Sequence, residues 1–93
     1  MNISVREVLS LNNPNLIDIR DEYKYLQGTI KNSINITESE LMFKTSKYLK
    51  RGEKYYIFCD YGNRSRRLSE YLHQRGYQVY NIVGGYRAYT VEK

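Results

Sequence analysis

Short apolar segments rich in β-forming residues alternate with helical segments along this chain, and this alternation constrains the fold more than any other feature. Four segments are predicted to be strands: residues 16–19, 34–36, 55–59 and 78–83. Helices are predicted at residues 4–11, 23–26, 37–51, 66–75 and 86–91. Strands that alternate with helices at short spacing are typical of βαβ units. The sequence therefore predicts an α/β fold in which helices cover both faces of a parallel sheet.

Capping residues and glycines mark several helix ends. Ser4 is expected to cap the first helix. Thr37, with Glu40 three residues later, has the pattern of a capping box for a helix that should run to Arg51 and end at Gly52.

Composition excludes several classes of protein. A length of 93 residues predicts a single domain, residues 1–93. One Cys cannot form an intrachain disulfide, and one Cys with one His cannot supply a structural zinc site, so no metal or other cofactor is expected. No apolar run is long enough to span a membrane, and residues 1–11 do not resemble a signal peptide. We therefore expect a cytoplasmic protein without a membrane partner.

The charge balance favours anionic partners. Fifteen Lys and Arg against ten Asp and Glu give a net charge of +5, which also serves solubility. Eleven Tyr among basic residues could stack on the bases of single strands. However, Tyr, Asn, Lys and Ile all use A/T-rich codons, so an A/T-rich bacterial genome explains their abundance. Basic residues cluster only at 47–51 and 64–67, and nucleic acid is therefore not the expected partner.

Cys59 lies at the carboxyl end of the most apolar predicted strand, where α/β sheets usually carry their functional site. The loop after it must turn into a helix, and Gly62 permits the backbone angles that this turn needs. Amides in such a turn form an anion site, and the helix N-terminus and Arg64 add positive potential. These features predict an activated nucleophile, against the alternative of a buried core cysteine.

Two common uses of a reactive cysteine do not fit this sequence. A Cys–His hydrolase needs a histidine beside the thiolate, but His73 lies roughly 12–15 Å along the following helix. A dithiol oxidoreductase needs a second cysteine, and the position three residues after Cys59 is Gly62. The remaining reactions use one thiolate and an anion site. They are sulfur transfer through a persulfide, and phosphate or arsenate chemistry through a thiol adduct.

Four motifs, spread over about residues 16–89, resemble those of the single-domain rhodaneses, a sulfurtransferase family. Their order and spacing make the resemblance specific. The first motif comprises Leu16-Ile17-Asp18-Ile19-Arg20, Tyr25, Gly28-Thr29-Ile30 and Ile34-Asn35-Ile36. The second is Cys59-Asp60-Tyr61-Gly62-Asn63-Arg64-Ser65, similar to the family's C-x-x-G-x-R-S loop. The third and fourth are Leu72 with Gly76-Tyr77, and Gly84-Gly85-Tyr86-Arg87-Ala88-Tyr89.

The resemblance implies a rhodanese-like three-layer fold with a mainly parallel five-stranded sheet flanked by helices. It implies that Cys59 takes a sulfane sulfur, for example from thiosulfate, and holds it as a persulfide. Arg64 would bind the oxyanion of a small anionic donor, and Asp18 and Arg20 would support the site from the neighbouring strand end. The loop residues that would cradle the sulfur are Asp60, Tyr61, Gly62, Asn63 and Ser65.

The chain departs from the family's pattern near this site. Thr29 stands where a His is common. Lys24 stands where a Glu usually pairs with Arg20, so Arg20 needs another acidic partner, such as Asp21 or Glu22. The last motif ends in Tyr in place of Trp, which keeps an aromatic side chain there.

Loop length separates the sulfur and phosphate alternatives. Cys59 and Arg64 have the spacing C-x4-R, whereas the loops of thiol phosphatases resemble the longer spacing C-x5-R. At that longer spacing this chain has Ser65 in place of an Arg. The shorter loop suits a single sulfur atom better than a tetrahedral phosphate. The first hypothesis is therefore a sulfurtransferase. The second is a persulfide carrier, supplied by a sulfur donor or serving an acceptor protein, and the third is a thiol-dependent phosphatase or arsenate reductase.

Overall fold

A computed structural model describes residues 1–92, so Lys93, the last residue of the expected domain, lies outside it. Within these residues the strands are β1 (Asn2–Ile3), β2 (Asn15–Asp18), β3 (Ile34–Asn35), β4 (Lys54–Phe58) and β5 (Gln78–Ile82). The helices are α1 (Val5–Leu9), α2 (Glu22–Gln27), α3 (Glu38–Phe43), α4 (Thr45–Tyr48), α5 (Asn63–Gln74) and α6 (Gly85–Glu92).

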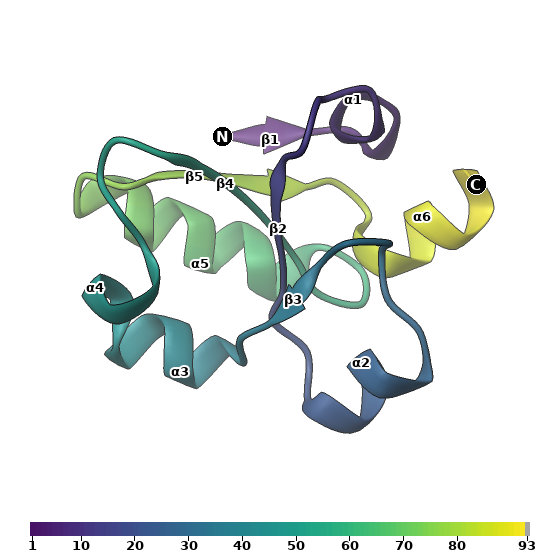
Figure 1. Ribbon diagram of the computed structural model, residues 1–93, viewed down its shortest axis with the longest axis horizontal. Coiled ribbons are helices and arrows are strands. Elements are labelled where there is room, and N and C mark those ends of the chain that lie inside the picture. The colour runs from purple at the N-terminus through teal and green to yellow at the C-terminus, as the bar shows by residue number, and fades with distance from the viewer. Residues whose placement is uncertain (93) are drawn as a thin grey trace.

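The five described strands form one sheet in the order β1-β5-β4-β2-β3 (Figure 1), and every neighbouring pair is parallel. This confirms the predicted α/β class, with a sheet that is parallel throughout. Parallel strands place their carboxyl ends at one edge. Asp18 at the end of β2 therefore lies beside Phe58 at the end of β4, and Cys59 follows directly.

The sheet separates two apolar layers, because side chains alternate between its faces. On β4, Tyr55 and Ile57 join the layer that includes Leu68 and Leu72 of α5. Tyr56 and Phe58 face the opposite way, toward a layer that contains residues of α1 and α6. Figure 1 shows α3, α4 and α5 on one side of the sheet and α1 on the other. Two covered faces explain why these strands are nearly continuous apolar runs.

The predicted helix over residues 37–51 is wrong, because the chain forms two short helices there. Lys44 separates α3 from α4 with a non-helical backbone φ of −125°. The Thr45 hydroxyl lies 2.8 Å from the carbonyl oxygen of Leu41 and 3.0 Å from that of Met42, so its one proton can satisfy either of these groups, which a continuing helix would bind. Thr37 caps α3 without the expected side-chain hydrogen bond.

The helix predicted over residues 4–11 ends earlier than expected, because α1 spans Val5–Leu9. The Ser4 cap of α1 is confirmed, and Glu7 completes a capping box with it. Strand β1 was not predicted. Its two residues extend the sheet by pairing with Asn81 and Ile82 of β5, and a strand this short has no periodicity to reveal it.

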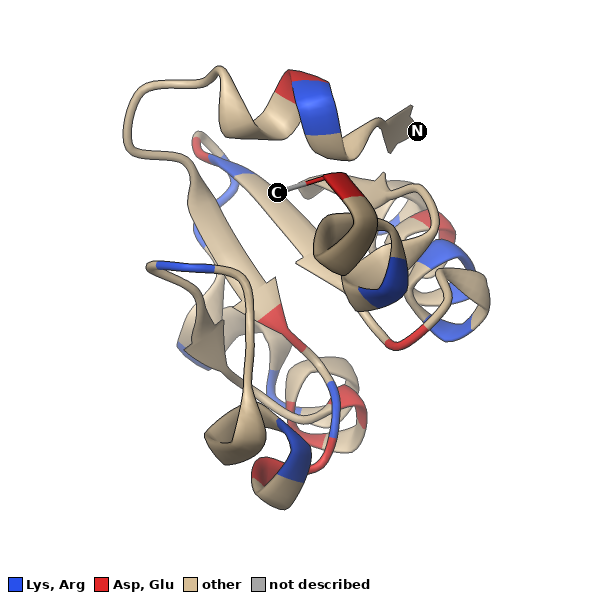
Figure 2. Ribbon diagram, turned by 90° about the vertical axis from the view of Figure 1, so that its right-hand side faces the viewer, with Lys and Arg blue, Asp and Glu red and all other residues tan. Residues whose placement is uncertain are grey.

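Helix α1 packs against α6 (Figure 2). Figure 2 also shows that basic and acidic residues are distributed over several helices and loops. In residues 1–92, no helix is both long enough and apolar enough to cross a membrane.

Candidate active site

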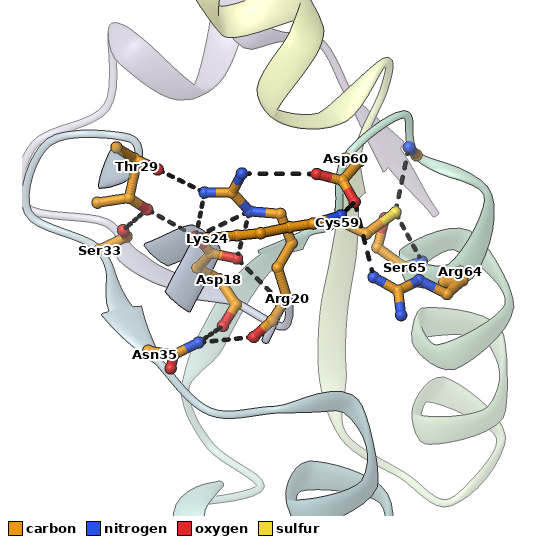
Figure 3. Close-up of polar contacts among 12 residues, drawn as sticks. Asp18, Arg20, Lys24, Thr29, Ser33, Asn35, Cys59, Asp60, Arg64 and Ser65 are labelled. Carbon is orange, nitrogen blue, oxygen red and sulfur yellow. Dashed lines mark hydrogen bonds and ion pairs between the residues drawn. The ribbon is translucent and has the colours of Figure 1, made fainter. Parts of the chain in front are cut away.

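The sulfur of Cys59 lies in a cradle of hydrogen-bond donors at the start of α5. The backbone N–H of Gly62 lies 3.2 Å from Sγ and that of Ser65 lies 3.4 Å from it. The Ser65 hydroxyl is 3.3 Å from the same sulfur (Figure 3). Cys59 is only 2% exposed and Ser65 is fully buried. The structure therefore brings together three of the predicted site residues around one sulfur atom.

This cradle favours the ionised thiol. Burial raises the pKa of Cys59, but hydrogen bonds from Ser65 and from the amides of Gly62 and Arg64 outweigh it and hold the pKa below its ordinary value. The sequence predicts the same downward shift of the Cys59 pKa. The cause differs from the expectation in one respect, because Arg64 lowers this pKa through its backbone amide and not through its guanidinium.

Two glycines allow the loop to take this shape. Gly62 has a φ of +99°, a conformation that other residues rarely adopt. Gly85 has a φ of +60°, and a Cβ there would collide with the carbonyl oxygens of Cys59 and Asp60. Because Gly85 lets α6 approach, the amides of Tyr86 and Arg87 donate to those same carbonyls at 2.9 and 3.0 Å. The N-terminus of α6 thus fixes the Cys59 loop from behind.

A buried ion-pair cluster supports the loop from the end of β2. Arg20, only 3% exposed, binds both carboxylate oxygens of Asp18, the shortest contact being 2.8 Å. Its Nη1 also lies 3.5 Å from Asp60, and Lys24 binds the same Asp60 carboxylate at 2.8 Å. The second acidic partner of Arg20 is therefore Asp60, and the expectation that Asp21 or Glu22 would serve is wrong.

Three further side chains complete this cluster, and sequence reasoning gave them no role. The Thr29 hydroxyl donates to Asp18 at 2.8 Å. Asn35 donates to the carbonyl oxygens of Asp18 and Arg20, at 2.9 Å each (Figure 3). The guanidinium of Arg20 lies 4.2 Å from the centre of the Tyr86 ring. The motifs contain all three residues, but only the fold shows what each one contacts.

The remaining predicted loop residues do not reach the sulfur with their side chains. Tyr61 is 70% exposed, and Asn63 is exposed at the first turn of α5. The Asp60 carboxylate faces the ion-pair cluster. The Arg64 guanidinium is partly exposed and lies 3.6 Å from Glu38 and 4.0 Å from Asp60. Arg64 therefore borders the site with its charge already shared between two carboxylates.

Asn81 is a buried polar residue that sequence reasoning placed only within a strand. It is 3% exposed, and its Oδ1 accepts a hydrogen bond of 2.6 Å from the Ser65 hydroxyl. Its Nδ2 donates to the side chain of Asn2 at 3.0 Å. A polar side chain in an otherwise apolar strand was the available signal, because such groups are normally buried for a specific partner.

A hollow of about 300 Å³ borders the loop on its outer side. Its lining residues are Lys24, Asp60, Tyr61, Tyr86, Arg87 and Thr90. The hollow is large enough for a small anion, and two cationic residues contribute to it. Among residues 1–92, no three His, Cys, Asp or Glu side chains come together in a way that would hold a metal ion.

A cysteine with a lowered pKa at a helix N-terminus, contacted by backbone amides, is suited to attack on an electrophilic sulfur. The model of the Rhodanese-like domain family matches residues 4–92. The chain belongs to this family. The rhodanese-like assignment covers every element described above except β1, and the resemblance seen in the sequence motifs is confirmed.

Known rhodanese-like proteins share both sequence and fold with this chain. A relative from Bacillus subtilis, named "Putative sulfurtransferase YtwF", is 29% identical over 77 residues, which are 83% of this chain and 74% of the relative. A rhodanese-related protein from Thermoplasma volcanium, known from a crystal structure, is 33% identical in sequence to this chain. The two structures match with a TM-score of 0.83 over 98% of this chain and 91% of that one. The human single-domain sulfurtransferase TSTD1 has the same fold, with a TM-score of 0.83 at 22% identity, over 99% of this chain and 96% of its own.

Proposed function

We propose that this rhodanese-like chain is a sulfurtransferase that carries a sulfane sulfur as a persulfide on Cys59. The observation that carries the proposal is the position of the Cys59 sulfur, 3.2 and 3.4 Å from two backbone N–H groups at the N-terminus of α5. Such donors stabilise a thiolate, and after transfer they stabilise the negative charge of a persulfide. The name of the Bacillus subtilis relative supports the same reaction class.

The proposed reaction with thiosulfate has two balanced steps. The Cys59 thiolate attacks the outer sulfur of thiosulfate, the sulfur–sulfur bond of the donor breaks, and sulfite leaves with the bonding electron pair. A thiophilic acceptor such as cyanide then attacks the outer sulfur of the persulfide. This second step releases thiocyanate and returns Cys59 as a thiolate, so no external oxidant or reductant is needed.

Arg64 is the proposed contact for the oxyanion of the donor. It lies in the first turn of α5, one residue before Ser65, and its guanidinium has a planar set of donors that matches sulfonate oxygens. The donor must compete with Glu38 and Asp60 for this guanidinium.

Intact-mass spectrometry tests the proposal directly. After incubation with thiosulfate, the protein should gain the mass of one sulfur atom, and cyanide should remove it as thiocyanate. Cys59→Ser is the matched control, because it changes one atom of the only cysteine. The absence of an adduct with thiosulfate and with a low-molecular-weight persulfide would overturn the proposal.

A second candidate is a persulfide carrier that receives sulfur from a protein and reacts poorly with thiosulfate. The observation that favours it is the pairing of Arg64 with two carboxylates, which lowers its affinity for a small anion. The two candidates differ in one measurement. A carrier forms the Cys59 adduct with a protein persulfide but forms little with thiosulfate at equal concentration.

A further inference from the structure

Three polar side chains, those of Ser65, Asn81 and Asn2, connect the sulfur of Cys59 to the edge strand β1. Ser65 contacts Cys59 at 3.3 Å and Asn81 at 2.6 Å, and Asn81 contacts Asn2 at 3.0 Å. Cys59, Ser65 and Asn81 are each at most 3% exposed. Each of these three side chains would therefore lose free energy of folding if its hydrogen-bond partner were removed, because water cannot easily take the partner's place.

The number of protons limits how this chain of contacts can be arranged. An amide oxygen has no proton, so the 2.6 Å contact requires Ser65 to donate to Asn81. A serine hydroxyl has only one proton, so it cannot donate to Cys59 at the same time. The hydroxyl oxygen still has lone pairs, and it can accept the proton of a neutral Cys59 thiol at 3.3 Å.

We propose that Asn81 is a positioning residue for Cys59: its side-chain oxygen holds the Ser65 hydroxyl proton away from the sulfur. While it donates to Asn81, Ser65 presents a lone pair to Cys59 and favours the resting thiol; once released from Asn81, its hydroxyl donates to the sulfur and lowers the pKa of Cys59. The hydroxyl can donate to a thiolate or persulfide only by leaving Asn81. The two backbone N–H donors stabilise the ionised sulfur in either case, so Asn81 limits how strongly the cradle activates Cys59. This inference rests on the proposed role of Cys59 as the nucleophile.

The charged groups around the loop do not perform the role proposed for Asn81, which is to hold the Ser65 hydroxyl proton away from Cys59. They are paired with one another, and none of their side chains belongs to the Ser65–Asn81 contact. Asp18 and Arg20 belong to β2 and the segment after it, and Lys24 belongs to α2. Glu38 lies in α3, Asp60 in the Cys59 loop and Arg64 in α5. Substitution of Asn81 leaves all six in place, so a change in the titration of Cys59 is attributable to Ser65.

The test is the pH dependence of Cys59 alkylation by iodoacetamide, followed by intact mass. Asn81→Leu keeps a similar volume and removes the acceptor, so the Ser65 hydroxyl becomes free to donate to the thiolate. The apparent pKa of Cys59 should fall by about one unit, which corresponds to one added hydrogen bond to a charged group. The reagent labels a single site, because the chain has only one cysteine.

Ser65→Ala provides the decisive comparison. If Asn81 acts through the Ser65 hydroxyl, Asn81→Leu should produce no further shift in a Ser65→Ala background. Val79→Ala is the matched control for packing, because Val79 is buried two residues earlier in β5 and belongs to the same core cluster as Cys59. It should lower stability without moving the pKa of Cys59.

Each other outcome contradicts the inference. A rise in the pKa with Asn81→Leu would mean that Asn81 donates to Ser65, and Ser65 to Cys59. An unchanged pKa, or a shift that persists without the Ser65 hydroxyl, would make Asn81 a packing residue. If Asn81→Leu does not fold, Asn81→Ala provides the same comparison with a smaller side chain. Alkylation needs no sulfur donor, so its result stands whether or not Cys59 forms a persulfide.

Discussion

The side chain of Arg64 lies between two carboxylates at the border of the site, and its removal should affect the donor more than the sulfur. In Arg64→Ala, the KM for thiosulfate should rise roughly tenfold or more, as expected for loss of a charge-assisted hydrogen bond of about 1.5–3 kcal/mol. Arg64→Lys should recover only part of this loss, because an ammonium group does not bind two oxygens in one plane. Steady-state kinetics with thiosulfate and cyanide measure both variants.

A protein persulfide serves as the control for Arg64. Arg64→Ala should still take up sulfur from it, because the sulfur itself contacts backbone amides. Unchanged kinetics with thiosulfate would show that Arg64 does not bind the donor. Loss of sulfur uptake from every donor would instead show that Arg64 orders the loop.

The titration of Cys59 is a second expectation at the scale of single residues. Since hydrogen bonds in the cradle outweigh burial, half-maximal alkylation should occur below the value of about 8.5 for a free thiol. The rate of alkylation against pH measures this value, with a cysteine-containing peptide of the same loop sequence as reference. A profile at or above that of the peptide would indicate that Cys59 is a structural cysteine.

Contacts among single residues were the least predictable part of the site. The position of Cys59 and the positive φ of Gly62 followed from the order of strand, loop and glycine. The pairing of Arg20 with Asp60 could not be predicted in this way. The two residues lie 40 positions apart, and only the parallel register of β2 and β4 brings them together. Asn81 was missed for the same reason, since its partner Ser65 lies on another element.

At the scale of elements, α6 holds the Cys59 loop only because Gly85 permits a close approach. Gly85→Ala introduces a Cβ that collides with two carbonyl oxygens, and it forces an unfavourable φ. The free energy of unfolding should therefore fall by about 2 kcal/mol or more. Urea denaturation followed by circular dichroism measures this change.

Gly52→Ala is the matched control, since nothing lies within 4 Å of a Cβ at that position. It should be close to neutral. Equal stabilities of the two variants would show that α6 does not depend on a close approach at Gly85.

Helix and strand identities were mostly predictable, and the exceptions have physical causes. Buried strands were found because two covered faces make their sequences continuously apolar. The break between α3 and α4 was missed, because the hydroxyl of Thr45 competes with the helix for backbone carbonyls, and apolar spacing does not report such competition.

For the whole molecule, Asp60 links the stability of the fold to pH. Burial raises the pKa of its carboxyl, but Lys24 and Arg20 outweigh burial and hold this pKa below its ordinary value. A carboxylate with a depressed pKa stabilises the folded state above its unfolded pKa, and this contribution disappears as the pH falls through the folded value. Wild-type stability should therefore decline below about pH 4.

Asp60→Asn isolates this effect. The variant should be less stable than the wild type at pH 6, and the difference should shrink as the pH falls through the depressed folded-state pKa of Asp60. Urea midpoints measured over this range test the expectation. A constant difference between the two proteins at all pH values would show that the Asp60 charge does not contribute.

The pairing of β1 with β5, and the contact of α6 with the Cys59 loop, give this chain an order of completion during synthesis. Strand β1 is synthesised before its partner strand β5, which follows it by about eighty residues. The reactive cysteine is made before Gly85 and α6, which support its loop. A nascent chain that ends before residue 84 would therefore carry the thiol without its rear support. The sheet is therefore completed by β5 and the support of the Cys59 loop by α6, and both of these elements follow Cys59 in the sequence.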